Sequence, residues 1–161
     1  MIAIIDYGLG NVQAFKDVYN RLNVPVLIAR SSKDLVNVTK LILPGVGSFD
    51  YAFMKLDESG MRNSIENLVV VKKIPILGVC VGMQMLAMSS EEGKLKGLGW
   101  VDATVKRFDS NNVAILPHMG WNNVIPKSYN GLFKNIKEDM KFYFLHEYYF
   151  DAYEKSDIEA I

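Results

Sequence analysis

A single cysteine lies in the segment with the clearest chemical signature of this sequence. The apolar run Ile76–Val79 leads into Cys80, and a helical pattern starts directly after it. A strand, a tight turn and a helix in this order form a nucleophile elbow, which presents the central side chain in a strained, exposed position. Glycines on either side, Gly78 and Gly82, let the strand and the helix approach closely. Cys80 is therefore the candidate nucleophile.

The helix after Cys80 would also assist its chemistry. A helix amino terminus carries partial positive charge, which favours the reactive thiolate. The N–H group of Val81 would point to where an oxyanion develops during attack on a carbonyl carbon. The alternative is that Cys80 is only a small buried apolar side chain, the commonest role of a free cysteine. The flanking glycines and the strand–helix junction favour the catalytic interpretation.

A second glycine-rich turn, Pro44–Gly47, follows the apolar run Leu41–Leu43. Loops at the carboxyl ends of parallel strands line one crevice, and N–H groups in such a loop can complete an oxyanion hole. Gly45 and Val46 are the candidate donors, and an ordinary tight turn is the equal alternative. The turn Asp6–Asn11 lacks the third glycine of a dinucleotide fingerprint, so we expect a loop on the same rim and no nucleotide site.

Short apolar runs alternate with helical patterns over the first ninety or so residues, and these elements must position the two turns. Strands are predicted at 2–5, 24–29, 41–43 and 74–79, and helices at 11–22, from 31, from 48 in two pieces around Gly60, and at 81–88. Asn11 suits a helix cap. Fully apolar strands separated by helices indicate a doubly wound, mostly parallel α/β sheet flanked by helices.

The pattern changes after Gly99. Alternation at 100–108 and an apolar run at 113–116 predict antiparallel strands, and the aromatic run 141–150 predicts one strand with a bend. Residues 157–161 have the pattern of a strand in progress. We therefore expect one domain over 1–161 that lacks its C-terminal strand and helix.

Composition narrows the class of protein. The 161 residues carry 18 basic and 18 acidic side chains, so no charge excess favours a nucleic-acid partner. One cysteine excludes an internal disulfide and favours a reducing, cytoplasmic setting. No apolar run approaches the roughly 20 residues of a membrane helix, and the first residues carry no basic leader.

Together these segments resemble the class I (triad-type) glutamine amidotransferases, which are flavodoxin-like. The elbow G-x-C-x-G-x-Q is the nucleophile signature of that class. Within it, the segments are most similar to the glutaminase subunits of imidazole glycerol phosphate synthases. The matching segments lie in family order over nearly the whole chain: 4–11, 43–49, 78–84, 97–100, 117–122 and 142–146.

The resemblance implies a mechanism and a partner. Cys80 would attack the side-chain amide of glutamine and release ammonia through a glutamyl thioester, with no cofactor and no metal. The oxyanion would be held by N–H groups of Val81, Gly45 and Val46. Ammonia would pass to a (β/α)8-barrel synthase subunit, which makes imidazole glycerol phosphate and aminoimidazole carboxamide ribonucleotide in histidine biosynthesis. The resemblance also implies substrate-binding residues, which are Gln84, Gly47 and Glu92 (with Glu91 beside it). The residues that it implies at the interface with the synthase are Asn11, His118, Trp121 and Asn122.

The match fails at the general base. The family uses a His oriented by a carboxylate in a late F-H-P-E segment, which this sequence does not contain. His118 belongs to the interface segment. His146 matches a position on the active-site side, but Glu147 would lie on the opposite face of a strand and could not orient it. We assign neither histidine as base, and we expect the chain as given to be inactive or nearly so.

Three alternatives remain open from the sequence. The same glutaminase module could feed ammonia to a sugar-modifying synthetase in surface-polysaccharide biosynthesis. A cysteine-elbow peptidase or chaperone-like relative would not carry the segment Pro117–Asn122. A non-catalytic pseudo-glutaminase, which only binds a synthase, would explain the missing His and Glu.

Overall fold

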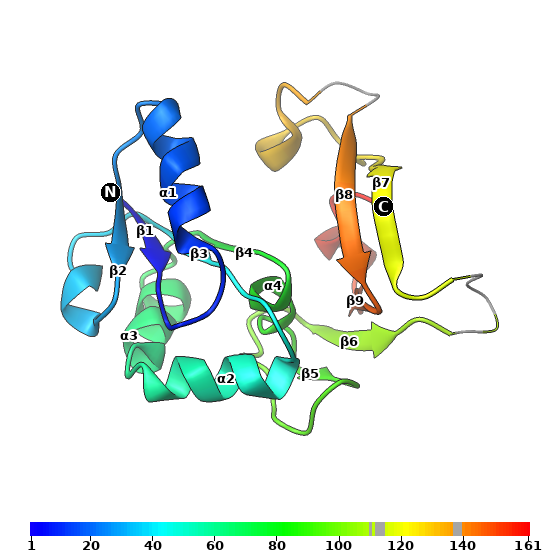
Figure 1. Cartoon of the computed structure of the whole chain (residues 1–161), viewed down its shortest axis with the longest axis horizontal. Coiled ribbons are helices and arrows are strands. Elements are labelled where there is room, and N and C mark those ends of the chain that lie inside the picture. Colours follow the sequence, from blue (N-terminus) through cyan, green and yellow to red (C-terminus); the bar gives the residue numbers. More distant parts are fainter. Residues whose placement is uncertain (110, 112–114, 137–139) are drawn as a thin grey trace.

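The computed structural model describes residues 1–109, 111, 115–136 and 140–161. Its N-terminal part is a parallel sheet in the order β2-β1-β3-β4 (Figure 1). The strands are β1 (Ile2–Ile5), β2 (Val26–Ala29), β3 (Lys40–Leu43) and β4 (Ile76–Gly78). The predicted parallel α/β sheet is therefore confirmed, with the second and fourth strands each starting two residues later than expected.

The connections between these strands change direction at β1. One connection leads outward to β2, and the later ones lead back past β1 to β3 and β4. Because parallel crossovers are right-handed, this reversal places the first helix on one face and the later helices on the other (Figure 1). The helical segments are α1 (Val12–Arg21), η1 (Ser32–Leu35), α2 (Phe49–Glu58), α3 (Arg62–Glu66) and η2 (Asn67–Val71).

Side chains of the parallel sheet and α2 build the main core. Ile5 and Leu43 from the strands and Phe49, Phe53 and Leu56 from α2 are all almost completely buried. Alternate residues of a strand face one side of a sheet, so these strands present one apolar row to α2. This packing fixes the carboxyl ends of β3 and β4, where the two glycine-rich turns begin.

The C-terminal part contains the predicted antiparallel strands. β5 (Ser89–Ser90), β6 (Ala103–Arg107) and β9 (Tyr148–Ala152) form one sheet, in which β6 and β9 are antiparallel. β7 (His118–Asn123) and β8 (Lys141–His146) form a separate antiparallel pair, which Figure 1 shows standing apart from the parallel sheet. The C-terminal part also contains two short helical turns, η3 (Gly131–Phe133) and η4 (Lys155–Asp157).

Several expected boundaries are wrong, each because strand pairing overrides the local pattern. The helix predicted at 81–88 ends as α4 (Val81–Gln84), since the Met88 N–H bonds to the carbonyl of Ala103, the first residue of β6. The strand predicted at 141–150 divides at Glu147 into β8 and β9, which lie in different sheets.

The two remaining expectations concern short apolar runs. In the run predicted at 113–116, residues 113 and 114 lie outside the described residues, and Ile115 and Leu116 form no strand. The strand predicted at 157–161 is limited to an isolated bridge between Pro126 and Ala160. Within the described ranges, no helix is long and apolar enough to cross a membrane.

Candidate active site

The nucleophile elbow predicted at Cys80 is present. β4 ends at Gly78, α4 starts at Val81, and Cys80 between them has φ 57° and ψ −125°. A side chain other than glycine in this conformation stores about 1–3 kcal/mol of strain, which surrounding packing must maintain. Cys80 is exposed. The expected geometry of a strained, accessible thiol is confirmed.

Glycines allow the elbow to touch the neighbouring loop through backbone atoms. A Cβ on Gly82 would lie 2.1 Å from the Leu43 carbonyl oxygen, and one on Gly45 would lie 2.4 Å from the Gly82 nitrogen. A Cβ on Gly78 would lie 2.5 Å from the Met83 Cα. No side chain fits at these distances, so glycine is required for the Pro44–Gly47 loop to pack beside α4.

A pocket of about 530 Å³ opens at Cys80. This volume is in the range of small-molecule sites. One wall comes from the elbow and its neighbouring loops and the other from the segments around β7, β8 and β9: Val46, Gly47, Cys80, Val81, Gln84 and Glu92, and Pro117, Leu145, His146, Glu147 and Tyr148. The structure thus brings together all of the predicted catalytic, oxyanion and substrate residues except Gly45, which packs against the backbone of Gly82.

Backbone donors are available at this pocket. Among the described residues, the N–H groups of Val81, Val46 and Gly47 donate to no protein acceptor. Val81 is the first residue of α4, so its N–H lacks a partner within the helix. Such amides can stabilise negative charge on a bound carbonyl oxygen.

Glu92 reaches the pocket from the loop after β5. Its Oε2 accepts the N–H of Phe49, the first residue of α2, at 2.8 Å. In return, the Asp50 carboxylate accepts the N–H groups of Lys94 and Leu95, each at 3.0 Å. A carboxylate at a helix amino terminus is electrostatically favourable, so the loop and α2 hold each other. Glu91 bonds instead to the N–H of Arg107, on β6.

Tyr7 supports the Pro44–Gly47 loop through its side chain. Its buried hydroxyl donates to the Pro44 carbonyl at 2.7 Å. Burial, and to a lesser extent the charge of Cys80, raise the pKa of Tyr7 above its usual value. Gly10 makes a second contact, because a Cβ there would lie 2.8 Å from the Pro44 Cβ. The turn after β1 therefore braces Pro44.

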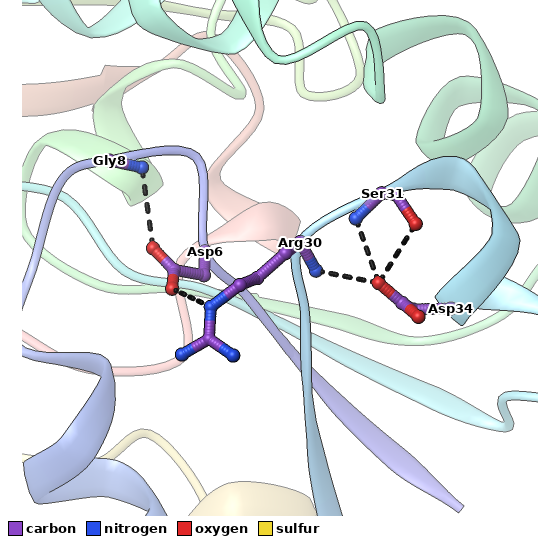
Figure 2. Close-up of polar contacts among 5 residues, drawn as sticks. All are labelled: Asp6, Gly8, Arg30, Ser31 and Asp34. Atoms are coloured by element: carbon purple, nitrogen blue, oxygen red, sulfur yellow. Dashed lines mark hydrogen bonds and ion pairs between the residues drawn. The ribbon is translucent and has the colours of Figure 1, made fainter.

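An exposed polar cluster ties the same turn to the end of β2, as Figure 2 shows. Asp6 accepts the Gly8 N–H at 3.4 Å and pairs with the Arg30 Nε at 3.0 Å. Asp34 accepts the Arg30 N–H, the Ser31 N–H and the Ser31 hydroxyl, each at 2.9 Å. These bonds, the one from Arg30 first, lower the pKa of Asp34. The cluster therefore links the segments that directly follow β1 and β2.

The two histidines meet at the other wall of the pocket. His118 Nδ1 and His146 Nε2 lie 2.9 Å apart, and His146 Nδ1 lies 2.7 Å from the Tyr148 carbonyl oxygen. Glu147 was expected to face away from His146 if both residues lay on one strand. It lies instead between β8 and β9, and it lines the same pocket as His146. Its carboxylate pairs with Arg107 at 3.0 Å, so it still does not orient His146.

The residues expected at the partner interface lie at two different elements, α1 and β7. Asn11 caps α1, its side-chain oxygen accepting the Ala14 N–H at 3.0 Å. His118, Trp121 and Asn122 lie on β7 and line a second hollow of about 930 Å³. Trp121 is 66% exposed and meets Tyr143 edge-on. In the described ranges, no group of three or more His, Cys, Asp or Glu side chains could hold a metal ion.

Sequence reasoning missed part of the second wall. Pro117, Leu145 and Tyr148 line the pocket, but nothing in the local pattern marks them as site residues. Leu145 on β8 and Tyr148 on β9 line it from either side of the division at Glu147. The bend expected within 141–150 was the available signal, and the structure shows that it separates two strands in different sheets.

Comparisons with known proteins agree with this geometry. The family model for class-I glutamine amidotransferases matches residues 3–161. The imidazole glycerol phosphate synthase subunit HisH of Bdellovibrio bacteriovorus is 54% identical over 157 residues, which are 94% of this chain and 76% of that protein. The subunit of the same name from Leptospira interrogans is 48% identical over 163 residues, 99% of this chain and 80% of that protein.

A solved structure shares the fold. A crystal structure of a glutamine amidotransferase superposes with a TM-score of 0.72 over 99% of this chain and 78% of that chain, at 18% identity. At that identity the likeness concerns the fold alone. The family match over nearly the whole chain and the two close relatives are decisive: this chain belongs to the class-I glutamine amidotransferase family.

Proposed function

We propose that this chain is the glutaminase subunit of an imidazole glycerol phosphate synthase and acts in histidine biosynthesis. The observation that carries the proposal is the pocket in which Cys80, on a strained elbow, faces the Val46–Gly47 loop, Gln84 and Glu92. The names of the relatives favour this assignment over a sugar-modifying synthetase. A reducing cytoplasmic location fits the one free thiol.

The residues of this chain provide nucleophile and oxyanion stabilisation. The Cys80 sulfur forms a bond to the amide carbon of glutamine, and the carbonyl electron pair moves onto oxygen. The N–H groups of Val81 and Val46 donate to that oxyanion. The pair then returns, the carbon–nitrogen bond breaks as the nitrogen takes up the proton that the thiol has given up, and ammonia leaves a glutamyl thioester. Water attacks the thioester carbon and releases glutamate and the thiol.

Binding of the amino acid falls to the residues around the thiol. Gln84 lies at the end of the first turn of α4, within reach of the same pocket. Glu92 is held in place by its bond to Phe49, so a positively charged amino group could meet a carboxylate that is already oriented. Gly47, with φ 88°, leaves the pocket mouth free of a side chain.

Neither histidine supplies the general base in this arrangement. The Nδ1 of His146 is bonded to the Tyr148 carbonyl, and its Nε2 is bonded to His118. A Cys–His–Glu centre therefore needs an acid–base group other than these two side chains. Losing such a group typically lowers turnover by about 10²–10⁴-fold, while attack of a thiolate on a reactive electrophile persists.

The partner proposed for this subunit is a (β/α)8-barrel synthase that receives the ammonia. Trp121 and Asn122 on β7 are the residues we assign to its interface. Trp121 is a large, exposed aromatic side chain of the kind that anchors protein interfaces. Asn11, at the exposed start of α1, would complete that contact surface.

Covalent labelling tests the glutaminase assignment. A glutamine analogue with an electrophilic ketone in place of the amide should add once per chain, at Cys80. We expect free glutamine to slow the addition at least tenfold and asparagine to leave it unchanged. Gln84→Leu should weaken the protection, and Gln13→Leu, on the exposed face of α1, is the matched control. Labelling that glutamine does not slow would favour a non-catalytic binding subunit.

A further inference from the structure

The two histidines of this chain form a cross-strand pair on β7 and β8. His118 Nδ1 and His146 Nε2 are 2.9 Å apart, which is hydrogen-bonding distance. At one end, His146 Nδ1 bonds to the Tyr148 carbonyl oxygen. At the other end, His118 Nε2 bonds to the Asn122 side-chain amide. We call these four linked residues the histidine network.

The protons of this network can be assigned from elementary valence. A carbonyl oxygen only accepts, so His146 must carry its proton on Nδ1. A neutral His146 then accepts at Nε2, and His118 must donate to it from its own Nδ1. His118 Nε2 is left as an acceptor and receives a proton from the Asn122 amide nitrogen. Every bond points the same way, and both rings are in the Nδ1–H form.

The network connects the pocket to an exposed surface. His146 and Tyr148 line the Cys80 pocket, whereas Asn122 is exposed on β7. Aromatic rings pack against both imidazoles. The centroid of the Phe108 ring lies 5.3 Å from that of His146, edge-on, and the centroid of the Phe144 ring lies 5.1 Å from that of His118. Rings fixed by hydrogen bonds at both nitrogens and by aromatic contacts have little freedom to turn.

We propose that His118 is a positioning residue for the Cys80 pocket. Together with Asn122 it fixes the His146 ring in the pocket wall, and through this ring the Asn122 surface is linked to the ligand site. The inference rests on the proposed function in one respect, that the ligand of the pocket is glutamine. His118 acts through His146 and does not itself line that pocket.

Nitrogen-15 NMR of the imidazole rings tests the proton assignment without any variant. The chain has two histidines, so His118→Asn assigns both sets of signals. Near neutral pH or slightly above it, we expect both rings in the Nδ1–H form, which is the minor tautomer of free histidine. A ring that carries its proton on Nε2 would overturn the assignment and the network with it.

Protection of Cys80 tests the link to the pocket. The chain has one cysteine, so iodoacetamide reports on that thiol alone. Removing a half-buried hydrogen bond should weaken glutamine protection by about fivefold to tenfold in His118→Phe. His118→Asn keeps an N–H donor toward His146 and should stay within about twofold of wild type. Asn122→Ala should weaken protection by about threefold, and the neighbouring Asn123→Ala should not change it.

The two proposals fail in different ways. If glutamine does not protect wild-type Cys80, the proposed function is wrong, and the tautomer measurement still decides the network. If glutamine protects wild type and His118→Phe equally, His118 does not position the pocket. Should His118→Phe fail to fold, Asn122→Ala against Asn123→Ala decides the same question.

Discussion

The two walls of the Cys80 pocket are held together by different contacts. The elbow wall is formed by Val46, Gly47, Cys80, Val81, Gln84 and Glu92, and the hairpin wall by Pro117, Leu145, His146, Glu147 and Tyr148. The elbow wall depends on backbone contacts: Gly45 and Gly82 touch through main-chain atoms, and the main core lies directly beneath. The hairpin wall depends on side chains, since His118 and His146 meet across two strands that expose much of their apolar surface. We infer that the elbow wall contributes more to the free energy of unfolding, whereas the side-chain contacts of the hairpin wall can change without unfolding the chain.

Gly82→Ala should have the largest effect, because it separates the two backbones of the elbow wall. Its Cβ would lie 2.1 Å from a carbonyl oxygen that cannot move without shifting β3. We expect the free energy of unfolding to fall by about 3 kcal/mol, measured by urea denaturation. Gly60→Ala, with φ 67° and open space around it, is the control and should lose about 1–2 kcal/mol. Equal losses would mean that backbone contact does not hold this wall.

Glu92→Ala should have the next largest effect, because it releases the loop from the start of α2. The Phe49 N–H, which is part-buried, would lose its carboxylate acceptor. We expect a loss of about 1–2 kcal/mol in unfolding free energy and weaker glutamine protection of Cys80. Glu91→Ala removes the neighbouring carboxylate outside the pocket and should leave protection unchanged. A Glu92 variant as stable as wild type would show that the loop is held by Asp50 alone.

Tyr7→Phe should lower stability by about 1 kcal/mol at neutral pH, since the bond to Pro44 is lost. The pKa of Tyr7 is raised in the folded chain, so the folded state keeps this proton after the unfolded state releases it. Wild type therefore loses stability as pH rises above about 10, and its advantage over the variant narrows. Alkaline titration of unfolding measures this. Tyr143→Phe, on the exposed hairpin, should lose stability with rising pH as wild type does. If the stability of Tyr7→Phe fell with pH as steeply as that of wild type, the raised pKa would not belong to Tyr7.

Trp121→Ala should have the smallest effect on stability and a large effect on assembly. The side chain is 66% exposed, so unfolding free energy should change by less than about 0.5 kcal/mol. Affinity for the barrel synthase should fall by at least about tenfold, measured by calorimetric titration. Val36→Ala, similarly exposed directly after η1, is the control for both measurements. Unchanged affinity would remove Trp121 from the interface.

The sequence by itself was enough for the elbow wall. Apolar runs of strand length determined the parallel sheet, and the glycines at 78 and 82 marked where strand and helix would pass close together. Cys80 could be placed on its strained turn because strand, turn and helix are adjacent in the chain. Local pattern is reliable here, since the residues that make the geometry are close in sequence and their chemistry permits few alternatives.

Only the tertiary structure decided the hairpin wall. The run 141–150 has one continuous β pattern, yet pairing of β8 with β7 and of β9 with β6 divides it at Glu147. Tyr148 and His146 line the pocket from either side of that division, and the pairing of β8 with β7 joins His146 to His118, 28 positions away. No local propensity encodes such a contact. Which partner a strand finds depends on the free energy of the whole packed chain, so the second wall could not be predicted from its own residues.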